Sequence, residues 1–158
     1  MIRVAVVEDA PLIAALWNAM IRETTSTFTT IEKTQEEVAS LITQRPGAFF
    51  VAGDGPEPVG FATYGPFRPG PGYTATVEHT IILSADAQGT GLGRALMARL
   101  EEAARADSIH VMIAAISNTN QDAQAFHGRL GFLEVARMPQ VGRKSGQWLD
   151  LVLMQKIL

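Results

Sequence analysis

The stretch Gln88-Gly89-Thr90-Gly91-Leu92-Gly93-Arg94 separates a β-like run, Thr76–Leu83, from a helix-like run, Leu92–Asp107. Its glycines alternate directly before the helix, so successive backbone N–H groups can point into one concavity with the positive end of the helix dipole behind it. Such a turn is suited to hold a diphosphate. Arg94 stands where a P-loop requires glycine or lysine, and the glycine spacing does not fit a dinucleotide-binding motif. The remaining pattern is Gln-x-x-Gly-x-Gly.

The composition describes one globular domain spanning residues 1–158. With 47% hydrophobic and 18% charged residues, a chain of this length can bury a substantial core. A net charge of −3 without a lysine- or arginine-rich block argues against nucleic-acid binding, which needs a basic surface. The absence of cysteine excludes disulfides, thiolate metal ligands and a cysteinyl acyl intermediate.

Neither a leader-like segment nor an apolar run of membrane-spanning length is found in the sequence. We therefore expect a cytoplasmic protein whose partner is a small molecule, with no nucleic acid, no membrane and no metal ion involved.

The residues before the glycine-rich stretch predict two helices and four strands. Apolar runs predict the strands, at Ile2–Val6, Phe49–Gly53, Val59–Tyr64 and Tyr73–Leu83. Asp9 ahead of Pro11 is read as the N-cap of the first helix. One face of that helix is apolar and is interpreted as core; it consists of Leu12, Ile13, Leu16, Trp17 and Met20. A capping box from Thr34 to Glu37 begins the second helix.

The residues after the stretch predict two more helices and three more strands. The helix Leu92–Asp107 leads to the apolar strand Ile109–Ile116, and a last helix runs from Asn120 to a C-terminal stop at Gly131. The strands Phe132–Met138 and Trp148–Gln155 then flank a predicted loop, Pro139–Gln147. The order β-α-α-β-β-β-α-β-α-β-β predicts an α/β protein with a strongly twisted mixed sheet and helices on both faces.

This order of elements, together with Gln-x-x-Gly-x-Gly, resembles the GNAT N-acetyltransferase superfamily. Within it the sequence is similar to the phosphinothricin and methionine sulfoximine acetyltransferase group. The stretches that carry this similarity are Thr24-Thr25-Ser26-Thr27-Phe28, Phe67-Arg68-Pro69 with Tyr73, Thr76-Val77-Glu78-His79-Thr80, and Asn120 with His127-Gly128-Arg129-Leu130-Gly131-Phe132. The resemblance implies acetyl-CoA as co-substrate and direct transfer, through a ternary complex, to the α-amino group of an amino-acid-like compound.

The resemblance also implies which residues bind acetyl-CoA. The backbone of Ile81, Ile82 and Leu83 would pair with the pantetheine amides, and Asn120 would contact the cofactor near the last helix. The pyrophosphate would be wrapped by the stretch formed of Gln88, Gly89, Thr90, Gly91, Leu92, Gly93 and Arg94. Gln88 replaces an arginine that many relatives have, and Ile82 replaces a frequent aromatic residue. Neither change removes a backbone donor.

Transfer to an amine needs a base, because an ammonium has no lone pair, and an acid for the departing thiolate. Glu78 is the candidate base, since it interrupts an apolar and hydroxylic strand and partial desolvation there would raise its pKa; a water can relay the proton. His127 takes the position of a tyrosine general acid in many members of the superfamily, and an imidazole can give or accept a proton. His79 alternates to the opposite face from Glu78 and is interpreted as structural.

The acceptor site is predicted at two loops. Arg68 can form a bidentate pair with a substrate carboxylate, with Phe67 and Tyr73 lining the pocket beside it. By resemblance, Thr25 and Phe28 close the pocket from the other side. The alternatives left open are another acceptor, namely a polyamine, an aminoglycoside or a protein N-terminus, and a non-catalytic acyl-CoA-binding module. The last strand-loop-strand suggests a homodimer.

Overall fold

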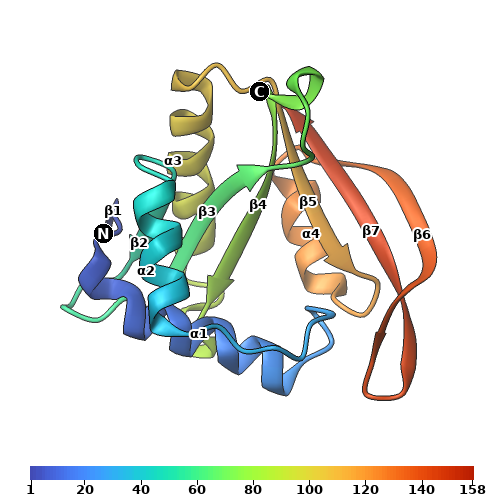
Figure 1. Cartoon of the computed structure of the whole chain (residues 1–158), viewed down its shortest axis with the longest axis horizontal. Coiled ribbons are helices and arrows are strands. Elements are labelled where there is room, and N and C mark those ends of the chain that lie inside the picture. The colour runs from blue at the N-terminus through green and yellow to red at the C-terminus, as the bar shows by residue number, and fades with distance from the viewer.

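The computed structural model describes all residues, 1–158, as a seven-stranded sheet with four α-helices (Figure 1). The sheet order is β1-β2-β3-β4-β5-β7-β6, and only the β4–β5 pair is parallel. The strands are β1 (Ile2–Val4), β2 (Phe49–Ala52), β3 (Gly60–Pro66), β4 (Thr76–Leu83), β5 (Val111–Ser117), β6 (Leu133–Lys144) and β7 (Gln147–Ile157). The helices are α1 (Ala10–Glu23), α2 (Gln35–Gln44), α3 (Leu92–Ala106) and α4 (Gln121–Arg129). The mixed α/β sheet predicted from the sequence is confirmed.

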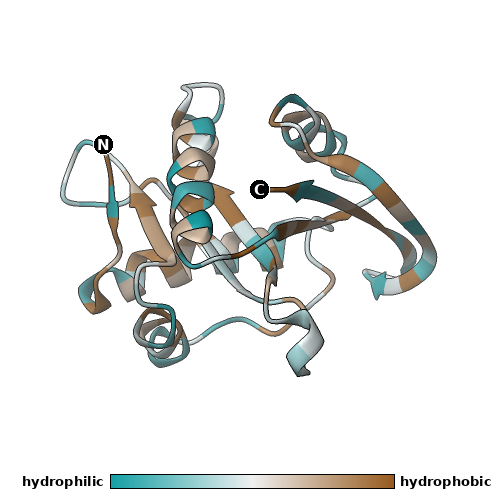
Figure 2. Cartoon of the chain, turned by 90° about the horizontal axis from the view of Figure 1, so that it is seen from above, coloured by the Kyte–Doolittle hydropathy of each residue, from teal (hydrophilic) through white to brown (hydrophobic).

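Helices cover both faces of the sheet, as Figure 2 shows from above. The alternation along β2 explains why: Phe49 and Val51 belong to the core under α1 and α2, whereas Phe50 and Ala52 belong to the core under α3. The same alternation divides β4, because Val77 lies in the α3 core and Ile82 in the α1–α2 core. Even-numbered residues of β4 therefore face α1, and odd-numbered residues face α3 and α4. No helix is long and apolar enough to cross a membrane.

The parallel pair of β4 and β5 is short, and this opens the sheet. Only Thr76–Glu78 pair with Val111–Ile113, although β4 continues to Leu83 and β5 to Ser117. On their outer sides both strands stay paired, β4 with β3 and β5 with β7. The two strands therefore diverge toward their C-terminal ends, as Figure 1 shows.

The last two strands are longer than the sequence predicted. In place of a loop at 139–147, β6 and β7 form one hairpin that turns at Ser145 and Gly146, both with positive φ (53° and 73°). Pro139 and the surrounding polar residues indicated a loop. The strand nevertheless continues, because it lies at a sheet edge and accommodates the irregularity in a register shift between Met138 and Gly142.

Two smaller predictions are also corrected. The strand predicted from Tyr73 begins at Thr76, and Pro71–Tyr73 form a 3-10 turn. Asp9 precedes α1 as predicted but its side chain makes no cap hydrogen bond there. Its carboxylate instead accepts two 2.7 Å hydrogen bonds from Arg3 and one from the Val6 N–H, so the ion pair uses the oxygens that a cap would need.

The other helix signals behave as predicted. Thr34 accepts a hydrogen bond from the Glu37 N–H at the start of α2, and the Glu37 carboxylate accepts one from the Thr34 N–H. Asn120 caps α4 through a 3.1 Å hydrogen bond from the Ala123 N–H. Gly131 ends that helix with a φ of 91°. These signals are local, and their residues therefore sufficed to predict them.

Candidate functional site

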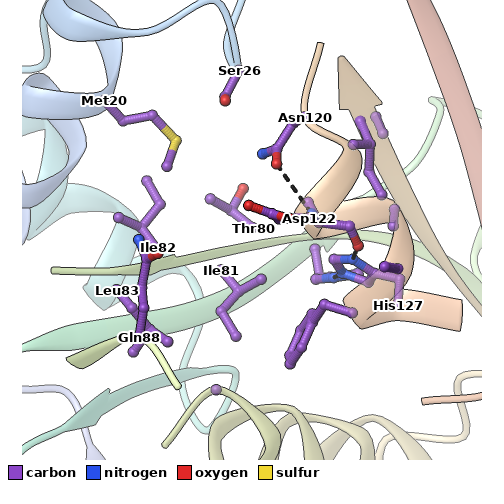
Figure 3. Close-up of a pocket in the computed structure, with 18 of the residues that line it drawn as sticks. Met20, Ser26, Thr80, Ile81, Ile82, Leu83, Gln88, Asn120, Asp122 and His127 are labelled. Carbon is purple, nitrogen blue, oxygen red and sulfur yellow. Dashed lines mark hydrogen bonds between the residues drawn. The ribbon is translucent and has the colours of Figure 1, made fainter. Parts of the chain in front are cut away.

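A cavity of about 630 Å³ occupies the opening between β4 and β5. Residues from both faces of the sheet line it: Met20 and Ser26 on the α1 side, and Asn120 and His127 of α4 on the other (Figure 3). Thr80 and Ile81 of β4 lie between these two groups. The cavity thus connects the two faces of the sheet through the gap where β4 and β5 are no longer paired.

The backbone from Gly89 to Arg94, which we call the cradle, forms one rim of this cavity. Gly89 and Gly91 have φ angles of 75° and 88°, a region that favours glycine. The Thr90 hydroxyl donates a 2.6 Å hydrogen bond to the Ala87 carbonyl and so closes the turn. No acceptor of the chain takes the N–H groups of the cradle, and the first turn of α3 contains no acidic residue. Free N–H groups at a helix N-terminus bind anions, and a diphosphate fits this set of donors.

Gly93 serves a different purpose from the other two glycines. A Cβ there would lie 3.1 Å from Leu83 and 3.4 Å from Phe126, whereas a Cβ at Gly89 or Gly91 would meet nothing within 4 Å. The absence of a side chain at Gly93 lets α3 approach β4 and α4 closely. Gly93 therefore fixes the position of the cradle, while Gly89 and Gly91 fix its shape.

Most residues predicted to bind the cofactor do line the cavity. These are Ile81, Ile82, Leu83, Gln88, Gly89, Gly91, Gly93, Arg94 and Asn120. The first three follow the last β4–β5 pair, so this edge of β4 has no neighbouring strand and can pair with amide groups of a ligand. Thr90 and Leu92 do not line the cavity; Thr90 closes the turn, and Leu92 packs against the core.

Glu78 lies where β4 and β5 separate, and it lines the cavity from the α1 side. Its side chain remains accessible to solvent, but the surrounding protein atoms desolvate the carboxylate and raise the pKa of Glu78 above its usual value. A carboxylate with a raised pKa is a better proton acceptor than one in open solvent. The position therefore suits a general base.

His127 lines the opposite side of the cavity, but both of its ring nitrogens are engaged within the protein. Nδ1 lies 2.7 Å from the Ala123 carbonyl oxygen, and Nε2 lies 2.9 Å from Nε2 of His79. Desolvation lowers the pKa of His127, and the same cause, with the repulsion of His127, lowers the pKa of His79 to about 3. The predicted role of His127 as a proton carrier remains a prediction, and this geometry weighs against it. The interpretation of His79 overlooked its contact with His127.

The α1 side of the cavity includes residues that sequence reasoning missed. Trp17 and Met20 belong to the apolar face of α1 that was interpreted as core; both pack against the core, as predicted, and both also line the cavity. Ser26 and Thr27 line it from the following loop. An apolar stripe on a helix has the same sequence pattern whether it packs on a sheet or borders a gap in a sheet. The hydroxyl-rich loop was the available signal, but the predicted residues were Thr25 and Phe28.

Thr25 and Phe28 hold this loop in place and do not line the cavity. The Thr25 hydroxyl lies 2.9 Å from that of Thr119, after β5. The Phe28 ring covers Gly142 of β6 so closely that a Cβ there would lie 2.3 Å from it. The buried Lys144 donates a 2.8 Å hydrogen bond to the Thr27 carbonyl. We call the contacts of Gly142 and Lys144 with residues 27–28 the hairpin latch.

The second predicted acceptor loop lies outside the cavity wall. Arg68 is exposed and lies over the Tyr73 ring, 5.4 Å from its centre, and the Phe67 and Tyr73 rings are 6.4 Å apart. None of the three lines the cavity. Their role in substrate binding remains a prediction. No group of three His, Cys, Asp or Glu side chains is placed to hold a metal ion.

Comparison with known proteins agrees with this architecture. The sequence model of the "Acetyltransferase (GNAT) family" matches residues 14–132. An L-methionine sulfoximine/L-methionine sulfone acetyltransferase of Pseudomonas paraeruginosa is 41% identical over 98% of this chain and 92% of its own length.

Two solved structures superpose closely. A phosphinothricin acetyltransferase from Sinorhizobium meliloti in complex with acetyl-CoA has a TM-score of 0.94 at 30% identity, covering all of this chain and 88% of its own. A ribosomal-protein-alanine N-acetyltransferase from Brucella melitensis has a TM-score of 0.94 at 37% identity, covering all of this chain and 99% of its own.

Replacing Gly91 by alanine should weaken the binding of acetyl-CoA, the ligand expected from the sequence. A non-glycine residue in this left-handed conformation costs roughly 1–2 kcal/mol, so we expect about 5- to 30-fold weaker binding by calorimetry. Gly55→Ala is the matched control, because a Cβ there also meets nothing within 4 Å but its φ is not positive. Equal affinity of Gly91→Ala and the parent would contradict the role of the cradle.

Proposed function

Because this chain belongs to the acetyltransferase (GNAT) family, we propose that it transfers the acetyl group of acetyl-CoA to the α-amino group of a small amino-acid-like acceptor. The acceptor class we propose is that of L-methionine sulfoximine, L-methionine sulfone and phosphinothricin, the compounds in the names of similar proteins. The proposal includes direct transfer in a complex that holds both substrates at once.

The observation that carries this proposal is a single cavity with two different sides. The cradle and α4 form the side that suits acetyl-CoA, with free N–H groups for the pyrophosphate and the unpaired edge of β4 for the pantetheine amides. Glu78 lies on the α1 side, together with Trp17, Met20, Ser26 and Thr27. The two substrates would meet in the gap between β4 and β5, where no covalent enzyme intermediate is needed.

In the proposed reaction, Glu78 accepts a proton from the acceptor ammonium, directly or through a water. The freed nitrogen lone pair attacks the thioester carbonyl, a C–N bond forms, and the C–S bond breaks. The nitrogen loses its second proton as the amide forms, and this proton passes, directly or through a water, to the departing thiolate. The products are the N-acetylated acceptor and CoA, and Glu78 returns its own proton to the solvent. The raised pKa of Glu78 supports its role as base.

A protein N-terminus is the second candidate acceptor, since a similar structure is named as an enzyme that acetylates ribosomal-protein alanine. The α1 side of the cavity supports the small acceptor instead, because the indole of Trp17 and the loop at Ser26 and Thr27 border it. Apolar side chains beside a few polar groups are typical of small-molecule sites.

Thiol release from acetyl-CoA, measured across a panel of amines, tests this function. We expect turnover with methionine sulfoximine, methionine sulfone or phosphinothricin, and much less with spermidine, an aminoglycoside or a peptide that begins with alanine. Turnover confined to the peptide would overturn the proposed acceptor class but retain the acetyltransferase. No turnover with any amine, despite acetyl-CoA binding, would contradict the proposed activity.

Glu78→Gln should lower kcat by at least roughly tenfold with little change in acetyl-CoA affinity, since positioned bases contribute about 10²–10⁴-fold. In the parent, kcat/KM should rise with pH as Glu78, whose pKa is raised, loses its proton. The variant should lack this rise of kcat/KM with pH. Glu57→Gln, in an exposed loop, is the control. A parent-like rate and pH profile in Glu78→Gln would eliminate Glu78 as the base.

We further propose that two copies of the chain associate through the β6–β7 hairpin. Several large apolar side chains are exposed there, with Val141 at 51% and Trp148 at 59% exposure, and β6 is an edge strand.

Trp148→Glu should therefore shift the molar mass measured by light scattering from dimer toward monomer. Ile31→Glu is the control, because Ile31 is also a large apolar residue, is 78% exposed, and lies in the segment before α2 and not in the hairpin. A parent protein that is monomeric at all concentrations, or a Trp148→Glu variant that dimerises as tightly as the parent, would refute this surface.

A further inference from the structure

Two histidines meet in the interior, at the boundary between β4 and α4. His79 is 7% exposed and His127 is 4% exposed, and their Nε2 atoms are 2.9 Å apart. Phe132 lies against both imidazoles, with ring centres 5.5 Å from His79 and 5.2 Å from His127. Neither histidine contacts a carboxylate. The pair therefore depends on its own protons and on the backbone for its hydrogen bonds.

The positions of these protons follow from the partners. The Ala123 oxygen is a carbonyl and can only accept, so Nδ1 of His127 carries a proton and donates it. Neutral His127 then has a bare lone pair on Nε2. The 2.9 Å contact requires a donor on the other side, so Nε2 of His79 carries the shared proton. This leaves Nδ1 of His79 without a proton, and that buried atom has no hydrogen-bond partner in the protein.

We propose that His79 is a positioning residue. By donating its Nε2 proton to His127, it occupies the last lone pair of that ring and keeps the part of the cavity wall that His127 forms neutral. A neutral wall matters because the proposed acceptor enters as an ammonium and would be repelled by an imidazolium. The role of His79 in catalysis rests on the proposed function, whereas the assignment of the two histidine tautomers is independent of it. In this arrangement His127 orients and borders the reacting groups without transferring a proton.

The charged groups around the pair do not replace this hydrogen bond. Lys156 lies 5.9 Å from the ring centre of Phe132 and is paired with Glu101 of α3. The others line the shared cavity: Glu78 from the opposite face of β4, Arg94 from α3, and Asp122 and Arg129 from α4. None of them is hydrogen-bonded to either imidazole.

Two variants of His79 separate this role from simple packing. His79→Gln keeps an N–H donor near the position of Nε2, whereas His79→Met has similar length and no donor. Nitrogen-15 NMR of the histidine rings, in the full chain without ligand, reports each tautomer and its titration. We expect parent His127 to be neutral and protonated on Nδ1 near neutral pH, and His79 to be protonated on Nε2.

In His79→Met, the freed Nε2 of His127 should accept a proton more readily, and the midpoint of its titration should lie at a higher pH than in the parent. The KM for the acceptor amine should then increase at least about fivefold as pH falls through this midpoint, because like charges repel, while acetyl-CoA affinity stays close to that of the parent. His79→Gln should restore the parent tautomer and the parent KM profile. A purely structural role would not link the KM to the titration of His127.

Two results would overturn the proposal. One is a parent His127 that is protonated on Nε2 or cationic near neutral pH. The other is a His79→Met variant whose His127 resonances and KM profile match those of the parent. If His79→Met does not fold, the parent tautomers decide the question. If no amine is a substrate, the proposed function fails, and the NMR titration still tests the histidine pair separately.

Discussion

The short parallel contact between β4 and β5 is the constraint on which the rest of this structure depends. Three residues of each strand pair, and then the strands separate, although each keeps a full antiparallel partner on its other side. A continuous sheet would fill this space with backbone hydrogen bonds. Here the unpaired edges border a cavity, and peptide groups of β4 remain free to bind a ligand.

Packing on both faces of the sheet supports the two sides of the cavity. Under α3, the fully buried side chains of Leu96, Met97 and Leu100 fix the helix on β2 and β3, and thereby fix the cradle at its first turn. On the other face, Ile13 of α1 and Phe61 of β3 anchor the helix that carries Trp17 and Met20. The two cores are separate clusters. Each side of the cavity is therefore supported by its own core.

Local signals in the sequence predicted much of this. The capping box at Thr34, the helix start at Asn120 and the helix stop at Gly131 depend on a few neighbouring residues, and these three were predicted. Alternation along β4 also placed Glu78 and His79 on opposite faces correctly. The contact of His79 with His127 joins residues 48 positions apart, and nothing in the strand itself indicates it.

The remaining errors have similar causes. Trp17 and Met20 belong to the same apolar stripe as the buried Ile13 and pack against the same core, so hydropathy alone cannot reveal that they also line the cavity. The hairpin of β6 and β7 was underestimated because edge strands tolerate proline and polar residues. Arg68 was chosen for its charge and loop, and its role in substrate binding stays a prediction; the sequence did not show that its loop lies outside the cavity lining, because the distance between a loop and a cavity is a property of the whole fold.

The hairpin latch connects the exposed edge of the β6–β7 hairpin with the loop that borders the α1 side of the cavity. Residues 27–28 are held by Gly142 and Lys144, and the same hairpin carries Val141 and Trp148 at the edge of the sheet. A shift of the hairpin therefore moves the loop that borders the α1 side of the cavity. Substitutions at the sheet edge can accordingly alter which molecules the cavity admits, and selectivity can evolve through residues that never touch the molecule being selected.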